Sequence, residues 1–187
     1  MNATVHILAT GYVGPKTAST VTLIRDGAAE IVVDPGMVAD RGLILAPLHE
    51  AGVDPIAVTD VVFSHHHPDH TLNAALFPNA RFHDHWAIYK DDDWHDRDAD
   101  GFQVSENVRL MRTPGHTPED ISTLVTTDEG LVVLTHLWWS ADGPAEDPYA
   151  TDSDGLHQYR NTVLELAPAR IVPAHGESFI PTAQTPR

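Results

Sequence analysis

The sequence contains no cysteine among its 187 residues. This absence excludes thiolate metal sites, disulfide bonds and a cysteine nucleophile. Any metal ion that this chain binds must therefore be held by nitrogen and oxygen ligands. The absence says nothing about the redox state of the compartment in which the chain works.

Basic residues are also scarce. The chain has 11 Lys and Arg against 27 Asp and Glu, which gives a net charge of -16, and its lysines are Lys16 and Lys90. A surface this acidic repels phosphate backbones, which argues against a general nucleic-acid binder. Cleavage of a small phosphodiester stays open, because bound metal ions would dominate the local field.

Long apolar segments are missing as well. No run of about 18 apolar residues occurs, so we expect no membrane span. The first ten residues, MNATVHILAT, have neither a basic region nor a long apolar stretch, so we expect no signal peptide and a cytoplasmic location. The length and the 42% hydrophobic content suit one globular domain, which is predicted to cover residues 1–187.

Short apolar segments separated by turns predict a strand-rich α/β fold. The segment TVTLIRDGAAEIVVDPG (20–36) predicts a hairpin around the turn Asp26-Gly27. The acidic run DDDWHDRDAD (91–100) predicts an exposed loop. The order of the elements indicates two sheets between helices, a four-layer αββα sandwich. Further strands are predicted at 4–9, 57–64, 80–86, 107–113, 120–127, 130–136 and 169–176, and helices at 41–51, 71–77 and 154–167.

Four potential metal ligands follow the apolar segment 57–64 directly: His65, His67, Asp69 and His70. Neutral imidazole and carboxylate are good ligands for zinc, iron and manganese. Residues at i and i+2 of an extended loop point the same way, so His65 and His67 can bind one ion together. Pro68 makes the following turn rigid and directs Asp69 and His70 toward a second ion.

Four motifs resemble those of the metallo-β-lactamase superfamily and occur in that family's order. They are VVDPG (32–36), SHHHPDH (64–70), TPGHTPED (113–120) and VPAHG (172–176), of which SHHHPDH resembles the H-x-H-x-D-H signature. Two further segments, TLNAALFP (71–78) and HQYRNTVLEL (157–166), are similar to a subfamily of small members, metallo-β-lactamase domain-containing protein 1 and its bacterial relatives.

The resemblance implies a dinuclear metal centre. Each ion would take three ligands: His65, His67 and His116 for the first, and Asp69, His70 and His175 for the second. Asp34 would support the ligand loops through hydrogen bonds. The two ions would share a hydroxide that attacks the substrate, and Asp69 would orient this hydroxide or accept its proton.

One position departs from the family pattern. Most dinuclear members carry an aspartate after the strand that corresponds to GLVVLT (130–135), and its carboxylate bridges the metals, whereas this chain has His136. A neutral imidazole has one available lone pair, so it cannot bridge two ions without losing its second proton. Three alternatives follow. His136 binds one ion of a pair bridged by solvent alone, or the second site is weak and one ion suffices, or His136 points away and serves as proton donor or substrate contact.

These features predict a hydrolase in which metal-bound hydroxide cleaves an ester, lactone, thioester or amide bond of a small molecule, with Asp69 and His136 as catalytic candidates. Zinc is the expected ion, one or two per chain, and iron or manganese suits the same ligands. The alternatives are a phosphodiesterase or ribonuclease of the same fold, and a non-catalytic metal or ligand sensor. Trp138, Trp139 and Tyr12 are candidates for the substrate wall, with core packing as the equal alternative. The substrate and the oligomeric state do not follow from the sequence.

Overall fold

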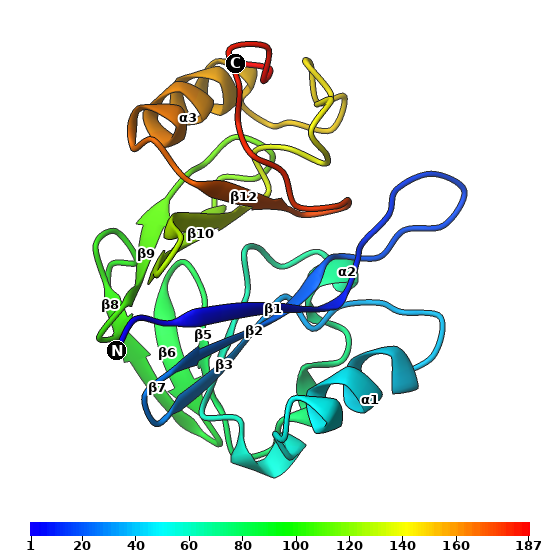
Figure 1. Ribbon diagram of the computed structural model, residues 1–187, viewed down its shortest axis with the longest axis vertical. Helices are drawn as coiled ribbons and strands as arrows, with labels where there is room; N and C mark the ends of the chain where they lie inside the picture. Colours follow the sequence, from blue (N-terminus) through cyan, green and yellow to red (C-terminus); the bar gives the residue numbers. More distant parts are fainter.

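A seven-stranded sheet forms one half of the computed structural model, which describes all residues 1–187 (Figure 1). Its strands follow one another in chain order, with β3, β4 and β5 parallel and the other neighbours antiparallel. The strands are β1 (Thr4–Ala9), β2 (Val21–Asp26), β3 (Ala29–Val33), β4 (Asp60–Val62), β5 (Arg81–His83), β6 (Ala87–Lys90) and β7 (Asp93–Asp96).

A five-stranded sheet forms the other half, in the order β12-β11-β10-β9-β8. Only β11 and β12 are parallel, and the remaining pairs are antiparallel. The strands are β8 (Gln103–Ser105), β9 (Val108–Arg112), β10 (Ile121–Thr127), β11 (Gly130–Thr135) and β12 (Arg170–Pro173).

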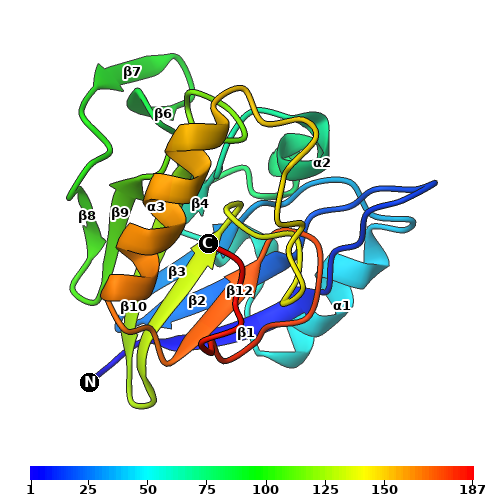
Figure 2. The same ribbon diagram turned by 90° about the horizontal axis from the view of Figure 1, so that it is seen from above.

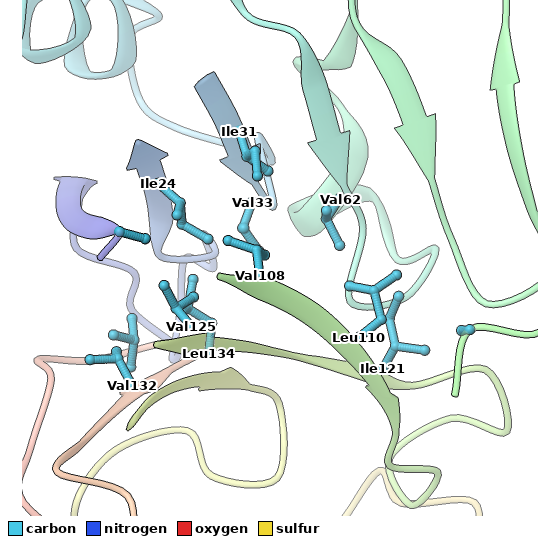
Figure 3. Packing of buried hydrophobic residues seen from close by; sticks show 13 residues of the cluster. Ile24, Ile31, Val33, Val62, Val108, Leu110, Ile121, Val125, Val132 and Leu134 are labelled. Atoms are coloured by element: carbon cyan, nitrogen blue, oxygen red, sulfur yellow. The ribbon is translucent and has the colours of Figure 1, made fainter. Parts of the chain in front are cut away.

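The two sheets face each other across a core of 13 buried hydrophobic residues. Figure 3 shows β-branched and leucine side chains of both sheets meeting there, among them Ile24, Ile31 and Val62 from one sheet and Leu110 and Ile121 from the other. Apolar residues at alternate positions of a strand face the same side, so each strand of the hairpin 20–36 contributes to this core.

Helices cover the outer faces of both sheets. Helix α1 (Gly42–Glu50) packs on the seven-stranded sheet through Ile44 and Leu48, and helix α3 (Ser153–Glu165) packs on the five-stranded sheet through Leu156 and Val163. Figures 1 and 2 show α1 and α3 on opposite sides of the molecule. The layer order is therefore helix, sheet, sheet, helix, which confirms the predicted αββα sandwich. No helix is long and apolar enough to cross a membrane.

The structure differs from the sequence-based expectation at short elements. The acidic run 91–100 is not a loop throughout, because β7 pairs with β6 and Trp94 stacks on Tyr89 with ring centroids 5.0 Å apart. The segment 71–77 is not one helix: α2 (Pro68–Thr71) ends early and a 3-10 turn, η2 (Ala74–Leu76), follows. A second 3-10 turn, η1 (Pro55–Ala57), precedes β4.

Helix α1 contains a proline in its interior, Pro47. Pro47 lies inside the helix, where the missing N–H removes one intrahelical hydrogen bond. The helix continues to Glu50 because Ile44 and Leu48 on either side of Pro47 are fully buried in the outer core. Tertiary packing thus outweighs the local penalty, as it commonly does in short helices.

Candidate metal centre

The predicted ligands come together at one end of the two sheets, in the loops beyond the strand ends. The segment His65–His70 follows β4 and Asp34 follows β3, both in the seven-stranded sheet. From the five-stranded sheet, His116 lies between β9 and β10, His136 follows β11 and His175 follows β12. Six histidines and two aspartates from distant parts of the sequence therefore face one another across the sandwich.

Three histidines form the first group. The Nδ1 atom of His67 lies 3.0 Å from Nε2 of His65 and 3.2 Å from Nε2 of His116. His65 and His116 are buried, whereas His67 is exposed toward solvent. This arrangement brings together the three residues that the resemblance assigned to the first ion.

The outer nitrogen atoms of this group fix its protonation. Nδ1 of His116 lies 2.8 Å from a carboxylate oxygen of the buried Asp147. A carboxylate only accepts hydrogen bonds, so His116 carries its proton on Nδ1 and its Nε2 lone pair faces inward. Nδ1 of His65 is 3.1 Å from Oγ of Ser64 and 3.6 Å from a carboxylate oxygen of Asp120.

Asp69, His70 and His175 form the second group. The Oδ2 atom of Asp69 lies 3.4 Å from Nε2 of His70 and 3.7 Å from Nε2 of His175. Nδ1 of His70 donates to Asp34 at 2.9 Å, and Nδ1 of His175 donates to the carbonyl of Ala18 at 3.0 Å. Both imidazoles thus turn Nε2 toward the centre, and Asp34 holds the loop in place by also accepting from the backbone N–H of Ser64 at 2.7 Å.

His136 lies between the two groups. Its ring can offer a ligand atom to a cluster with His65 and His116 and equally to a cluster with His70 and His175. Its Nε2 atom is 3.2 Å from Nε2 of His175, and its buried Nδ1 has no hydrogen-bond partner. His136 therefore does not point away, and it occupies the place between the groups where the resemblance expects a bridging carboxylate.

Four histidines of the centre have lowered pKa values. Burial and the neighbouring histidines hold the pKa of His65 and of His136 well below the usual range, so both are neutral at pH 7. Burial also lowers the pKa of His67 and of His175. Neutral imidazole is the form that binds a metal ion, so these side chains need no deprotonation at neutral pH.

His70 and Asp69 in the second group instead favour positive charge. Burial by itself would lower the pKa of His70, but the adjacent carboxylates of Asp34 and Asp69 raise it to about 9. Burial would raise the pKa of Asp69, but its hydrogen bond to His70 and the charges of His70 and His175 lower it to about 2. The carboxylates that stabilise a proton on His70 also favour a cation at the same place.

A metal ion fits this donor set. The facing nitrogens of His65, His67 and His116, at 3.0 and 3.2 Å, are close enough together to bind one cation in their unprotonated form. Nδ1 of His136 is also buried without a hydrogen-bond partner, which is costly in a folded protein. The clustered histidines are therefore able to bind metal, with carboxylates placed behind them as in many metal sites.

A pocket of about 650 Å³ opens over the centre. Its floor includes His67, Asp69, His116, His136 and His175, and its walls come from the loop after β1 and the loop after β11. Trp139 lines it, whereas Trp138 is fully buried in the core under α3. Tyr12 is 40% exposed and is not among the lining residues, where its neighbours Val13 and Gly14 stand instead.

Two supporting aspartates were missed by the sequence analysis. Asp120 lies within the motif TPGHTPED and accepts hydrogen bonds from the N–H and the hydroxyl of Thr117, so its place in the motif was a usable signal. Burial raises the pKa of Asp120 to about 6 despite those hydrogen bonds. Asp147 lies in an irregular loop 31 residues after His116, and nothing in the local sequence marks it.

The sandwich with histidines clustered at the sheet ends is the architecture that the resemblance implied. Residues 14–144 match the metallo-beta-lactamase superfamily, and the chain belongs to this superfamily. Metallo-beta-lactamase domain-containing protein 1 of Xenopus laevis is 33% identical over 94% of this chain and 80% of that protein. The human protein of the same name is 32% identical over 80% of this chain, which spans 59% of the human length.

Solved structures agree in fold. A Thermotoga maritima protein of metallo-beta-lactamase type superimposes with a TM-score of 0.76 at 23% identity, over 97% of this chain and 100% of that one. A dizinc quorum-quenching lactonase, solved with the product N-hexanoyl-L-homoserine, superimposes with a TM-score of 0.61 at 18% identity, over 84% of this chain and 72% of that one. At these identities the likeness concerns the fold alone.

Proposed function

We propose that this chain is a metal-dependent hydrolase that cleaves an ester, lactone, thioester or amide bond of a small molecule, with zinc as its ion. The observation that carries the proposal is the set of inward-facing imidazole nitrogens at the floor of an open pocket. Metal-dependent hydrolysis is the chemistry that such an open nitrogen-rich site supports. The dizinc lactonase of the same fold supports both the choice of zinc and the acyl bond.

Seven residues would hold the ions in this proposal. They are His65, His67 and His116 for the first ion, Asp69, His70 and His175 for the second, and His136 shared between them or bound to one. When bound, such ions lower the pKa of water and polarise the oxygen of the bond under attack.

Asp69 and His136 would act on the reacting atoms. Both line the pocket, and the pKa of Asp69 is lowered to about 2, so its carboxylate is ionised at neutral pH. An ionised carboxylate can accept a hydrogen bond from the attacking water and hold its proton. His136 would be a metal ligand first, because its ring lies between the two groups rather than at the pocket rim.

The test compares zinc-loaded protein, chelator-treated protein and His67→Ala on p-nitrophenyl esters and on bis-p-nitrophenyl phosphate. We expect ester hydrolysis that a chelator abolishes and zinc restores, and we expect His67→Ala to lose zinc and activity together. Elemental analysis of untagged protein gives the metal content independently of turnover. Comparable cleavage of the phosphodiester would favour the phosphodiesterase alternative, and bound zinc without turnover of either substrate would favour a sensor.

A further inference from the structure

Part of the pocket lining beside the histidines is apolar. Val13 comes from the loop after β1, and Trp139, Pro148 and Tyr149 come from the loop after β11. Trp139 and Tyr149 stack with ring centroids 6.0 Å apart and planes 18° from parallel. Two loops from different sheets therefore contribute apolar side chains to the pocket beside the candidate metal centre.

Much of this surface is open to solvent. The side chain of Tyr149 is 69% exposed and that of Val13 is 43% exposed. Large apolar side chains gathered at a pocket rim commonly mark a ligand-binding surface, and a stacked aromatic pair offers a flat platform at little entropic cost. Trp138, next in the chain, is instead fully buried.

No cation lines the pocket. The chain carries 11 Lys and Arg, and none of them is a lining residue. Lys16 is the nearest along the chain to the lining residues Gly14 and Thr17, but it is exposed and lies outside the lining. Asp69 is the one charged residue of the lining besides the histidines. An anionic group that lies on the apolar part of the lining, away from the metal centre, would lose hydration without gaining a counter-charge from a side chain.

We propose that Trp139 and Tyr149, together with Val13 and Pro148, form a subsite for an uncharged apolar group of the substrate. The pocket would therefore disfavour substrates that carry an anionic group in addition to the bond that is cleaved. The inference rests on the proposed hydrolase function for its kinetic test. It adds the substrate class and names residues that determine specificity, of which Trp139 also packs against the ring of His175.

The kinetic experiment uses zinc-loaded protein with two matched substrates, p-nitrophenyl hexanoate and the mono-p-nitrophenyl ester of adipate. They differ in a terminal methyl against a terminal carboxylate. We expect kcat/KM for the hexanoate to be at least about tenfold higher after correction for uncatalysed hydrolysis, because the carboxylate must be desolvated without a partner. Comparing kcat/KM removes the effect of unproductive binding of the carboxylate to an ion.

Three variants locate the effect. Tyr149→Ala should raise KM for the hexanoate by about two- to tenfold, the range of one aromatic contact, with kcat little changed. Val13→Lys should reduce or reverse the ratio of kcat/KM for the hexanoate to kcat/KM for the adipate half-ester. Added salt should weaken this effect, because it screens the charge of the new lysine. Ile180→Lys adds the same charge at a residue that is 73% exposed and outside this pocket, and it should leave the preference unchanged.

Binding without turnover separates the two proposals. Hexanamide is titrated into the protein and followed by tryptophan fluorescence, and Tyr149→Ala should weaken its binding by about two- to tenfold. Hexanamide binding that depends on Tyr149 without any ester turnover would reject the hydrolase and keep the apolar subsite. Ester turnover with equal or higher kcat/KM for the adipate half-ester would reject the subsite, and loss of that activity in Lys16→Ala would assign an anion site to the loop after β1.

Discussion

The outer nitrogen atoms of the histidines decide which lone pairs face the centre. Asp147, Asp34 and the carbonyl of Ala18 each accept a hydrogen bond from a Nδ1 atom, so Nε2 of the histidine concerned is left free for an ion. Such partners behind the ligands orient the rings and raise their basicity. At the scale of single residues, the centre therefore depends on groups that never touch an ion.

Asp147→Asn tests this dependence. The two carboxylate oxygens accept from Nδ1 of His116 and from the N–H of Tyr149, and an amide can replace only one of them. The ring of His116 then loses its fixed orientation, and the affinity of the first group for zinc should fall about 10- to 100-fold. Competition against a chromogenic chelator measures the affinity. Asp142→Asn in the same loop is the control, because Asp142 is exposed, and an equal loss in both variants would contradict the prediction.

We expect the residue at position 136 to influence how many ions the centre binds. A single imidazole lone pair cannot serve two ions at once, whereas a carboxylate can. We expect His136→Asp to raise occupancy of the second ion toward two per chain, as measured by elemental analysis after dialysis against limiting zinc. Unchanged stoichiometry would show that the substitution at this position does not control the second ion.

At the scale of elements, the loop after β3 and helix α2 approach so closely that only glycine fits between them. A Cβ on Gly36 would lie 1.5 Å from the carbonyl oxygen of Asp69. The same carbonyl accepts hydrogen bonds from the backbone N–H groups of Ser19 and Met37, so it cannot move without breaking both. The backbone of the second ligand group is thus held by three segments of the chain.

Gly36→Ala should therefore displace the loop that carries Asp69 and His70. We expect the variant to lose affinity for the second zinc ion and to lose about 1–3 kcal/mol of stability, the usual cost of overpacking. Isothermal titration and urea unfolding measure the two effects. Gly42→Ala is the control, since its Cβ would meet only the flexible side chain of Asp40.

The end of β2 and the turn between β8 and β9 connect the two sheets through one carboxylate. Asp26 accepts hydrogen bonds from the hydroxyl of Ser105 at 2.6 Å and from the backbone and side chain of Asn107 at 2.7 and 2.8 Å. Burial by itself would raise the pKa of Asp26, but these hydrogen bonds lower it below the ordinary value of 3.8. The folded state thus binds this proton more weakly than the unfolded state does.

The contribution of Asp26 to stability should therefore decrease at low pH. Stability from a lowered pKa is fully present above pH 3.8 and is lost as pH falls through the folded-state pKa. Asp26→Asn should cost about 1–2 kcal/mol at pH 7 and progressively less below pH 4, measured by urea unfolding with chelator present so that metal loss plays no part. Asp92→Asn, on the exposed part of the acidic run, should show no such pH-dependent loss in the free energy of unfolding.

At the scale of the whole molecule, the centre joins the two sheets. Asp34 and the segment His65–His70 belong to the seven-stranded sheet, and His116, His136 and His175 belong to the five-stranded sheet. An ion held from both sides binds the folded sandwich and not the unfolded chain, so the stability it adds grows with the logarithm of the ratio of free ion to dissociation constant.

Zinc should therefore raise the melting temperature. At a free concentration about 100 times the dissociation constant, the gain of about 2.7 kcal/mol corresponds to roughly 5–10 °C for a domain of this size. Thermal unfolding with and without a chelator measures the shift. A shift of the same size in His67→Ala would mean that the zinc responsible binds elsewhere.

Local patterns determined much of this protein in advance. The alternation in 20–36 and the apolar strand before His65 predicted strands and the layered fold, and the resemblance carried by the four motifs implied the set of residues that meet at its end. The strands could be predicted because strand periodicity acts between residues close along the chain. Short elements such as β7 and α2 escaped this reasoning, because pairing with β6 and contacts to the loop after β3 decide them.

Only the tertiary structure decided the rest. It placed Asp147 behind His116 across 31 residues, put His136 between the two groups, buried Trp138 and left Trp139 in the pocket wall. Each of these depends on how two sheets and their loops meet in space, and no local pattern encodes a contact between distant segments. The sequence thus determined which chemical groups are available, and the packing of the sandwich determined which nitrogen, which wall and which neighbour each group presents.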